Sequence, residues 1–177
     1  MKGQKMDGSI QVYYGNGRGK TTAALGLGIR AAGVGKQVIM VQFLKKKHSD
    51  TLDFLKKLEP ELQIFRFEKA ACGYSDLSPK EKQEQMLNIK NALGYSRKVL
   101  DTGQCDLLIL DEIFGLVDYN IITIEELMDL IAVKKDSMDL ILTRRNLPDE
   151  VREIADCVYS IQREKEKTPE ILAQGNF

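Results

Sequence analysis

The sequence has no tryptophan, a single histidine (His48) and only three cysteines among its 177 residues. The cysteines, Cys72, Cys105 and Cys157, are widely spaced and form no C-x-x-C pair. Neither a disulfide framework nor a zinc site is therefore expected. This cysteine usage is typical of a reduced, cytoplasmic protein.

An excess charge of one sign and a long apolar run are also missing. Lys plus Arg and Asp plus Glu number 26 each, so the formal net charge is zero. A neutral chain lacks the general attraction to nucleic acid or anionic membranes that a basic protein has. The basic run Lys45–Lys47 is interpreted as a solvated surface. No segment approaches the roughly 20 apolar residues of a membrane span, and residues 1–8 contain no apolar signal segment. We expect neither nucleic acid nor a membrane as partner.

What the chain does have is an alternation of apolar, β-branched runs with helical patterns. No repeat or linker interrupts it, which predicts one domain over residues 1–177. Several runs are almost continuously apolar, as in strands covered on both faces of a parallel sheet. The expected strands are Ile10–Tyr14, Gln37–Phe43, Gln63–Phe67, Leu107–Asp111, Leu140–Thr143 and Cys157–Ile161.

The helices between these runs carry start and stop signals. Ser78 and Thr123 are each followed three residues later by glutamate, the pattern of a capping box, and Pro79 suits a first helical position. A helix over Lys20–Ala32 is expected to end at Gly33 and Gly35, where left-handed caps cost little. Its internal glycines, Gly26 and Gly28, lower helix propensity, and we expect close packing on the sheet to explain them. The pattern predicts a three-layer α/β fold with a mostly parallel sheet of about six strands and helices on both faces.

A phosphate-binding loop follows the first expected strand. It reads "GNGRGKTT" and lacks the first glycine of the general G-x-x-x-x-G-K-[ST] pattern, where Tyr14 stands instead. Glycines allow backbone N–H groups to converge on an anion, and the start of the next helix adds its positive end. Lys20 supplies a charge to phosphate oxygens, and the Thr21 hydroxyl suits a magnesium ion. The expected phosphate-binding set is Gly15, Asn16, Gly17, Arg18, Gly19, Lys20, Thr21 and Thr22.

A second element, "LLILDE", ends an apolar strand in two carboxylates, Asp111 and Glu112. The carboxyl edge of a parallel sheet is where α/β folds bind ligands, so the pair is expected beside the loop. With Thr21, these acids are the predicted magnesium ligands. The three-layer fold is thereby expected to be of the P-loop NTPase (RecA-like) type, but the residues do not specify the reaction.

Taken together, these segments resemble the ATP:corrinoid adenosyltransferases, P-loop enzymes that adenosylate cob(I)alamin or cob(I)yrinic acid a,c-diamide. The segment "GNGRGKTTAALGLGIRAAGVGKQVIMVQFLK" is similar to the family's opening, in which the first glycine of the general pattern is also absent. "DLLILDEI", "TIEELMDLI" and "LILTRRNLPDEVREIADCVYSIQREK" are similar to its acidic strand, following helix and arginine turn. The match covers most of the chain.

The resemblance implies a reaction and its participants. In this family ATP lies with its triphosphate reversed, the Co(I) of a reduced corrinoid attacks the 5′ carbon, and triphosphate leaves. By position, Lys20, Thr21 and Glu112 are the catalytic residues, Asp111 supports Glu112, and Arg145 contacts phosphate. Gln42 and Phe43 are placed at the mouth of the site. ATP, Mg²⁺, a reductase that supplies electrons to cobalt and a homodimeric assembly are implied as well.

The chain departs from the family in its corrinoid-facing segment, "AACGYSD". Tyr74 stands for a phenylalanine and Asp76 for a tryptophan, while Lys46, Arg144 and Asn146 occupy glycine positions. The altered segment keeps two alternatives open: a P-loop ATPase or nucleotide-binding module that has lost corrinoid chemistry, and a small-molecule kinase.

Overall fold

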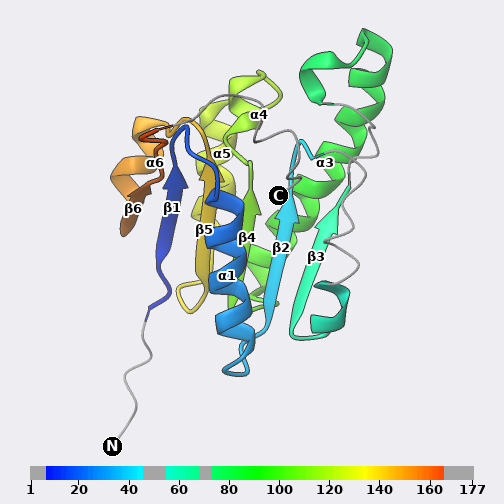
Figure 1. The fold of residues 1–177 in the computed structure, drawn as a ribbon. Coiled ribbons are helices and arrows are strands. Elements are labelled where there is room, and N and C mark those ends of the chain that lie inside the picture. The colour runs from blue at the N-terminus through cyan, green and yellow to red at the C-terminus, as the bar shows by residue number, and fades with distance from the viewer. Residues whose placement is uncertain (1–6, 46–54, 68–72, 166–177) are drawn as a thin grey trace, which may run out of the picture.

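The computed structural model describes residues 7–45, 55–67 and 73–165, which form a six-stranded sheet flanked by helices. All five strand pairings are parallel, and the strand order is β3-β2-β4-β5-β1-β6. The strands are β1 (Ile10–Tyr14), β2 (Val38–Gln42), β3 (Leu62–Arg66), β4 (Leu107–Asp111), β5 (Asp139–Arg144) and β6 (Cys157–Ser160). Figure 1 shows them fanning out with their carboxyl ends at one edge.

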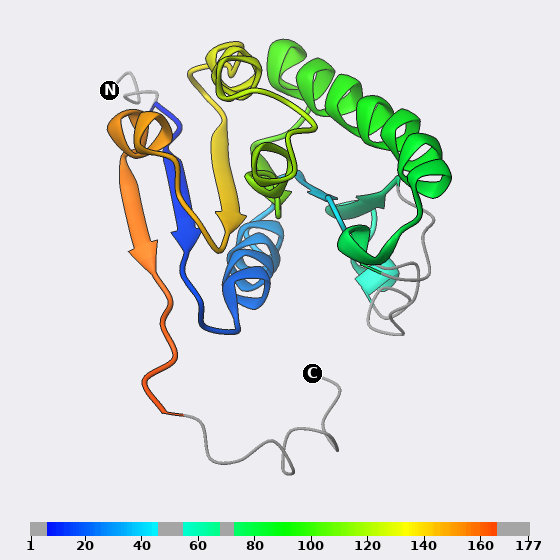
Figure 2. The same cartoon turned by 90° about the horizontal axis from the view of Figure 1, so that it is seen from above.

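Helices lie on both faces of the sheet, so the fold is the expected three-layer α/β architecture. The helices are α1 (Lys20–Ala32), α3 (Pro79–Thr102), α4 (Gly115–Asp118), α5 (Ile124–Ala132) and α6 (Asp149–Ile154), with short 3₁₀ turns η1 (Lys56–Leu58) and η2 (Tyr74–Asp76). Figure 2 shows α1 on one face and α3, α5 and α6 on the other.

Each face carries its own apolar core. The larger core joins residues such as Val41, Leu108 and Leu110 of the sheet to Ile89 of α3 and Leu127 of α5. The smaller core joins Met40 and Ile109 to Ala24 of α1. Neighbours along a strand thus point to opposite cores, which explains why β2 and β4 are apolar at nearly every position.

The predicted strands are confirmed, with every boundary within one residue of the observed one. Both capping boxes are confirmed: Ser78 and Thr123 accept from the backbone N–H of Glu81 and Glu126, and each glutamate accepts from the cap's own N–H. The predicted stop of α1 is half right. Gly33 is right-handed, with φ −62°, and only Gly35, with φ +85°, is left-handed.

The two glycines inside α1 have different surroundings. A Cβ on Gly28 would lie 3.1–3.3 Å from methyl groups of Ile109, Leu62 and Val38, so the predicted close packing on the sheet is confirmed there. A Cβ on Gly26 would meet nothing within 4 Å, so the same explanation is wrong for Gly26.

Two further sequence expectations concern the membrane and the thiols. No helix in the described part of the chain is long and apolar enough to span a membrane. Cys105 and Cys157 are free thiols, and burial raises the pKa of Cys105 to about 12, so its reactive thiolate form is suppressed. Cys72 and His48 lie outside the described residues.

Candidate nucleotide site

The phosphate loop occupies the turn between β1 and α1 at the carboxyl edge of the sheet. Gly19 immediately precedes the helix in the left-handed conformation, with φ +104°, which glycine adopts at little cost. Lys20 is the first helical residue. Free N–H groups and the positive end of the dipole of a 13-residue helix therefore face this edge.

Gly15 and Gly17 contact the protein chain itself, at the turn after β5 and at the segment after β6. Their N–H groups donate to the carbonyls of Arg145 and Ile161, both at 2.9 Å. A Cβ at Gly15 would lie 2.3 Å from the Ile161 carbonyl oxygen, and one at Gly17 would lie 2.8 Å from it. Because these two residues have no side chain, the segment that follows β6 can lie directly against the loop. Their amides already have protein partners here, which corrects the expectation that both N–H groups converge on phosphate.

Lys20 is held inside the loop by hydrogen bonds to the loop's own carbonyls. Its ammonium donates to Gly15 O at 2.7 Å and Gly17 O at 2.8 Å. Burial lowers the pKa of Lys20, and the nearby cations Lys45 and Arg145 act in the same direction while Glu112 opposes them. A polyanion in the site would offset the crowding of these cations.

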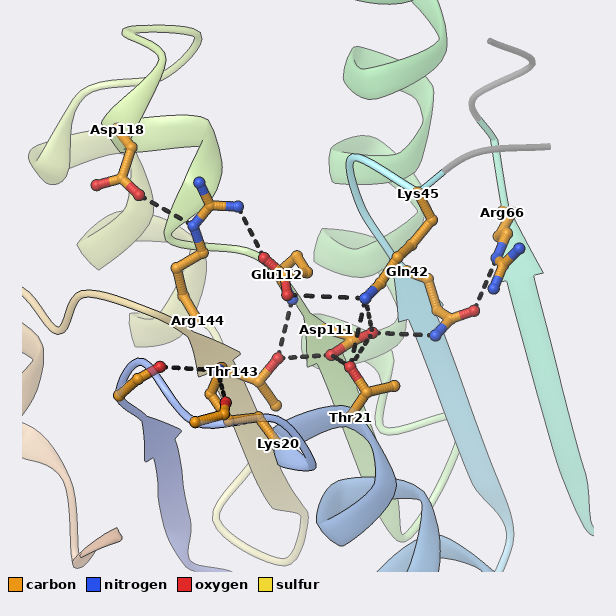
Figure 3. A network of polar contacts seen from close by, with 12 residues as sticks. Lys20, Thr21, Gln42, Lys45, Arg66, Asp111, Glu112, Asp118, Thr143 and Arg144 are labelled. Atoms are coloured by element: carbon orange, nitrogen blue, oxygen red, sulfur yellow. Dashed lines mark hydrogen bonds and ion pairs between the residues drawn. The ribbon is translucent and has the colours of Figure 1, made fainter. Parts of the chain in front are cut away.

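Asp111 is the centre of a buried hydrogen-bond network, drawn in Figure 3. Its side chain is fully buried and accepts from Thr21 Oγ1 at 2.9 Å, Thr143 Oγ1 at 2.6 Å and Gln42 Nε2 at 3.0 Å. Arg66 donates to Gln42 Oε1 at 2.8 Å, which orients the amide toward Asp111. The structure thus brings Asp111 and Thr21 together as expected, and adds Thr143, which the sequence did not single out.

Glu112 faces the other way, toward the arginine turn. It has φ +66°, a left-handed backbone that is rare for a residue with a side chain and that clusters at functional sites. Its N–H donates to Thr143 Oγ1 at 3.0 Å. Its carboxylate accepts from Arg144 Nη1 at 2.7 Å.

Arg144 bridges two acidic residues. Besides Glu112 it contacts Asp118, whose Oδ2 lies 3.0 Å from its Nε, and it lies 5.7 Å over the ring of Tyr119. Burial alone lowers the pKa of Arg144, but the pairs with Glu112 and Asp118 outweigh it and raise the pKa. The guanidinium stays charged. Arg145, which the family pattern favours for phosphate, is exposed beside it.

These side chains border a polar cavity of about 600 Å³, a volume within the range of small-molecule sites. Its lining residues are Gly15, Asn16, Lys20, Glu112, Arg144, Arg145 and Arg163. Four of them are cations and one is a carboxylate, so the cavity has the charge to receive a polyphosphate. Arg163, from the segment after β6, was not predicted, because nothing in the sequence marks its return to the loop.

Three expectations near the end of β2 are revised. Phe43 is fully buried in the larger core, so its predicted place at the mouth of the site is wrong. Gln42 is also buried, and its amide serves Asp111 rather than an open cavity. Lys45 is not the solvated surface residue that the basic run suggested, because its ammonium lies 3.5 Å from Asp111 Oδ2 and 3.7 Å from Glu112 Oε1. Lys46 and Lys47 lie outside the described residues.

The described part of the altered corrinoid-facing segment, residues 73–76, contacts Tyr119. Tyr74 is half-buried in η2, and its ring centroid lies 5.1 Å from that of Tyr119. The Lys82 ammonium lies 5.7 Å from the centroid of the Tyr74 ring. Burial raises the pKa of Tyr74, so its hydroxyl stays protonated at neutral pH. Residues 70–72, the first three of the segment, lie outside the described residues.

The oxygen atoms of Thr21, Asp111 and Glu112 fit a magnesium ion that also takes nucleotide oxygens and water. Within residues 7–45, 55–67 and 73–165 no group of three or more His, Cys, Asp or Glu side chains could hold a metal ion by itself. The Lys45 ammonium beside these oxygens shows that the position favours a cation. The set suits a metal that arrives with a nucleotide.

Comparison with known proteins gives the family. The ATP:corrinoid adenosyltransferase family BtuR/CobO/CobP matches residues 6–174. A corrinoid adenosyltransferase of Escherichia coli K12 is 30% identical over 155 residues, covering 88% of this chain and 76% of its own. The corrinoid adenosyltransferase CobA of Salmonella typhimurium is 29% identical over 159 residues, covering 90% and 79%.

The fold is shared more widely. The crystal structure of a KaiC-like protein from Pyrococcus horikoshii superposes with a TM-score of 0.62 at 20% identity, over 91% of this chain and 75% of that one. This likeness supports the three-layer P-loop fold alone. Together with the match over residues 6–174, the phosphate loop and its acidic partners show that the chain is a transferase enzyme of the ATP:corrinoid adenosyltransferase family.

Proposed function

We propose that the protein transfers the 5′-deoxyadenosyl group of ATP to the cobalt of a reduced corrinoid, cob(I)alamin or cobyrinic acid a,c-diamide, and releases triphosphate. One observation carries this proposal. Arg144, which lines the four-cation cavity at the phosphate loop, lies 5.7 Å over the ring of Tyr119, and that ring contacts the ring of Tyr74. A site for a polyanion and an aromatic surface therefore lie side by side.

The bond changes define what the residues have to do. Co(I) donates an electron pair to the 5′ carbon, the bond from that carbon to the α-phosphate oxygen breaks, and triphosphate departs with those electrons. Negative charge grows on the leaving group, so cations fixed around it lower the barrier. Lys20, Arg145 and Arg163, which line the cavity, would supply that charge, together with the amides of Gly19 to Thr22 at the helix start. Asn16 and Arg18 add side-chain donors.

Magnesium, held by Thr21 and Glu112 with Asp111 behind them, would add positive charge at the triphosphate. Asp111 fixes the Thr21 hydroxyl by a hydrogen bond. Gln42 and Thr143 in turn fix Asp111. The chain's own contribution is thus a set of oxygens held in place by hydrogen bonds before the ligand arrives. A reductase that supplies cob(I) species, a homodimeric state and a cytoplasmic location remain predictions.

The test is an anaerobic assay with chemically reduced cob(I)alamin, ATP and Mg²⁺. The cobalt absorbance is expected to change to that of an adenosylcorrinoid, which light then bleaches. Lys20→Ala is expected to abolish the change, since it removes the charge at the centre of the loop. Lys36→Ala, at the opposite edge of the sheet, is the matched control and is expected to behave as the unmodified protein.

A second function is favoured by one departure, Asp76 in place of the family's tryptophan. Asp76 is exposed and accepts from the Ser75 hydroxyl at 3.1 Å, so it offers no aromatic surface to a corrin. A nucleotide-binding ATPase without corrinoid chemistry would bind ATP and leave the cobalt spectrum unchanged. That outcome, with ATP hydrolysed, would replace the proposed function.

A further inference from the structure

The ammonium group of Lys45 lies where the expected magnesium ligands converge. Its Nζ is 3.4 Å from Thr21 Oγ1, 3.5 Å from Asp111 Oδ2 and 3.7 Å from Glu112 Oε1. Figure 3 shows the three contacts radiating from one nitrogen, above the end of β4. These are the same three side chains whose oxygens suit Mg²⁺, so the lysine holds the place of a cation.

The charge balance explains why a cation is needed there. Asp111 is fully buried, and a buried carboxylate is costly unless it is hydrogen-bonded and paired with a positive charge. Gln42, Thr21 and Thr143 provide hydrogen bonds but no charge. Lys45 forms an ion pair with both Asp111 and Glu112.

The chain positions Lys45 by a defined turn. The N–H of Phe43 donates to the Asp111 carbonyl at 2.9 Å, and its ring is buried in the core. Leu44 then adopts φ +56°, a left-handed conformation that a branched side chain rarely takes. Gly115 lies opposite this turn, and a Cβ there would lie 2.5 Å from Leu44 Cδ1, so the Leu44 side chain would have to shift to admit one.

We propose that Lys45 is a tethered counter-ion that competes with Mg²⁺ for Thr21, Asp111 and Glu112 and has to leave before the metal binds. The inference rests on the proposed function, because it concerns the magnesium site of that function. Two cations cannot share these oxygens, so Lys45 weakens the binding of free Mg²⁺. The triphosphate brings negative charge that draws in the metal and gives the displaced ammonium new anionic partners. The site thereby favours Mg²⁺ that comes with a nucleotide.

The test measures Mg²⁺ affinity without nucleotide, from the rise in melting temperature across a Mg²⁺ titration. Lys45→Met is expected to bind Mg²⁺ about tenfold more tightly than the unmodified protein, the size of effect that one neighbouring charge has at partly exposed sites. Without Mg²⁺, the same variant is expected to melt at a lower temperature, because Asp111 loses its counter-ion. Lys45→Arg keeps the positive charge and is expected to keep the weak affinity.

Lys36→Met is the matched control. Lys36 also pairs with a part-buried aspartate, Asp139 at 3.0 Å, but at the opposite end of the sheet, so this variant is expected to leave Mg²⁺ affinity unchanged. Lys45→Gln, which keeps a hydrogen-bond donor, replaces Lys45→Met if that variant does not fold.

Two results would overturn the inference. One is an unchanged or weaker affinity for free Mg²⁺ in the neutral Lys45 variants. The other is a loss of MgATP affinity with no gain for Mg²⁺, which would make Lys45 a phosphate ligand. The cobalt assay on the unmodified protein is a separate readout. Its failure would refute the proposed function while leaving the Mg²⁺ comparison valid.

Discussion

At the scale of single residues, the site is a balance between two carboxylates, the buried Asp111 and the partly exposed Glu112, and an excess of cations around them. Asp111 draws on neutral donors and Lys45, whereas Glu112 draws on Arg144. Lys20 is held by backbone carbonyls and by no acidic partner at hydrogen-bond distance among the described residues. The carboxylates are thus neutralised by cations before a ligand arrives.

Tyr74→Ala tests the corrinoid side of this arrangement. Removing the ring opens the aromatic contact with Tyr119 but leaves the phosphate loop intact, so we expect corrinoid turnover to fall about tenfold or more, the equivalent of roughly 1.4 kcal/mol of lost aromatic contact. ATP affinity, measured by calorimetry, is expected to change less than twofold.

Tyr159→Ala is the matched control, because Tyr159 also belongs to a tyrosine pair, with Tyr13 at 4.8 Å, but on β6. It is expected to leave both quantities unchanged. Equal losses of ATP affinity and corrinoid turnover in Tyr74→Ala would refute the assignment of Tyr74 to the corrinoid.

The sequence predicts only those site residues that stand in a recognisable local motif. Lys20, Thr21 and Asp111 stand in motifs whose position after a strand fixes where they lie. Lys45 and Thr143 carry no such mark, since their roles arise because β2 and β5 flank β4 on its two sides. Lys45 was hidden further by its basic neighbours, which suggested a solvated run. Phe43 was misplaced because an aromatic residue at a strand end can face either the core or the edge.

At the scale of elements, sequence and structure agree because each signal is local. A capping box is a contact across three residues, and β4 is apolar at every position before Asp111 because both of its faces are covered. The role of Gly28 was also predictable in kind, since a helix that lies close on a sheet needs small residues. The different surroundings of Gly26 were not predictable, because they depend on which way each residue of α1 faces.

Gly26→Ala and Gly28→Ala form a matched pair on one helix. At exposed Gly26 the alanine meets nothing, so its better helix propensity is expected to raise the free energy of unfolding by about 1 kcal/mol. At Gly28 three methyl groups lie within 3.3 Å of the new Cβ, so their displacement is expected to cancel that gain. Urea unfolding at neutral pH measures both values. Equal stabilisation by the two substitutions would contradict the close packing of α1.

At the scale of the whole molecule, the strand order gathers the site. The phosphate loop follows β1, Arg144 ends β5, Asp111 ends β4, and the turn to Lys45 follows β2. In the sheet, β5 and β4 lie between β1 and β2. All four contribute from their carboxyl ends, the edge where ligands bind in such folds. The chain order does not reveal this strand order, because each crossover helix can carry the chain past one strand or several.

At the opposite edge of the sheet, Asp139 links β5 to Ser9 and Lys36. Its carboxylate accepts from the Ser9 N–H at 2.9 Å and pairs with Lys36 at 3.0 Å. Burial by itself raises the pKa of Asp139, but the bonds from Ser9 and Lys36 outweigh it and lower the pKa. The folded protein therefore binds this proton less readily than the unfolded chain, and the stabilisation is present above about pH 4 and lost as the pH falls below it.

Asp139→Asn tests the contribution of these contacts to stability. The variant is expected to be less stable than the unmodified protein in urea at pH 7. The difference is expected to shrink as the pH falls below about 4, because the unfolded chain then takes up a proton on Asp139 that the folded protein binds less readily. A stability difference that is the same at pH 7 and at pH 3 would show that the charge of Asp139 plays no part.

In the proposed reaction a cationic loop expels triphosphate whole while cobalt takes the adenosyl group. The most direct measurement is the identity of the phosphate product after anaerobic turnover with cob(I)alamin, ATP and Mg²⁺, resolved by phosphorus NMR. Intact triphosphate, equimolar with the adenosylcorrinoid, is the predicted result. ADP with orthophosphate, and cobalt left unadenosylated, would contradict it.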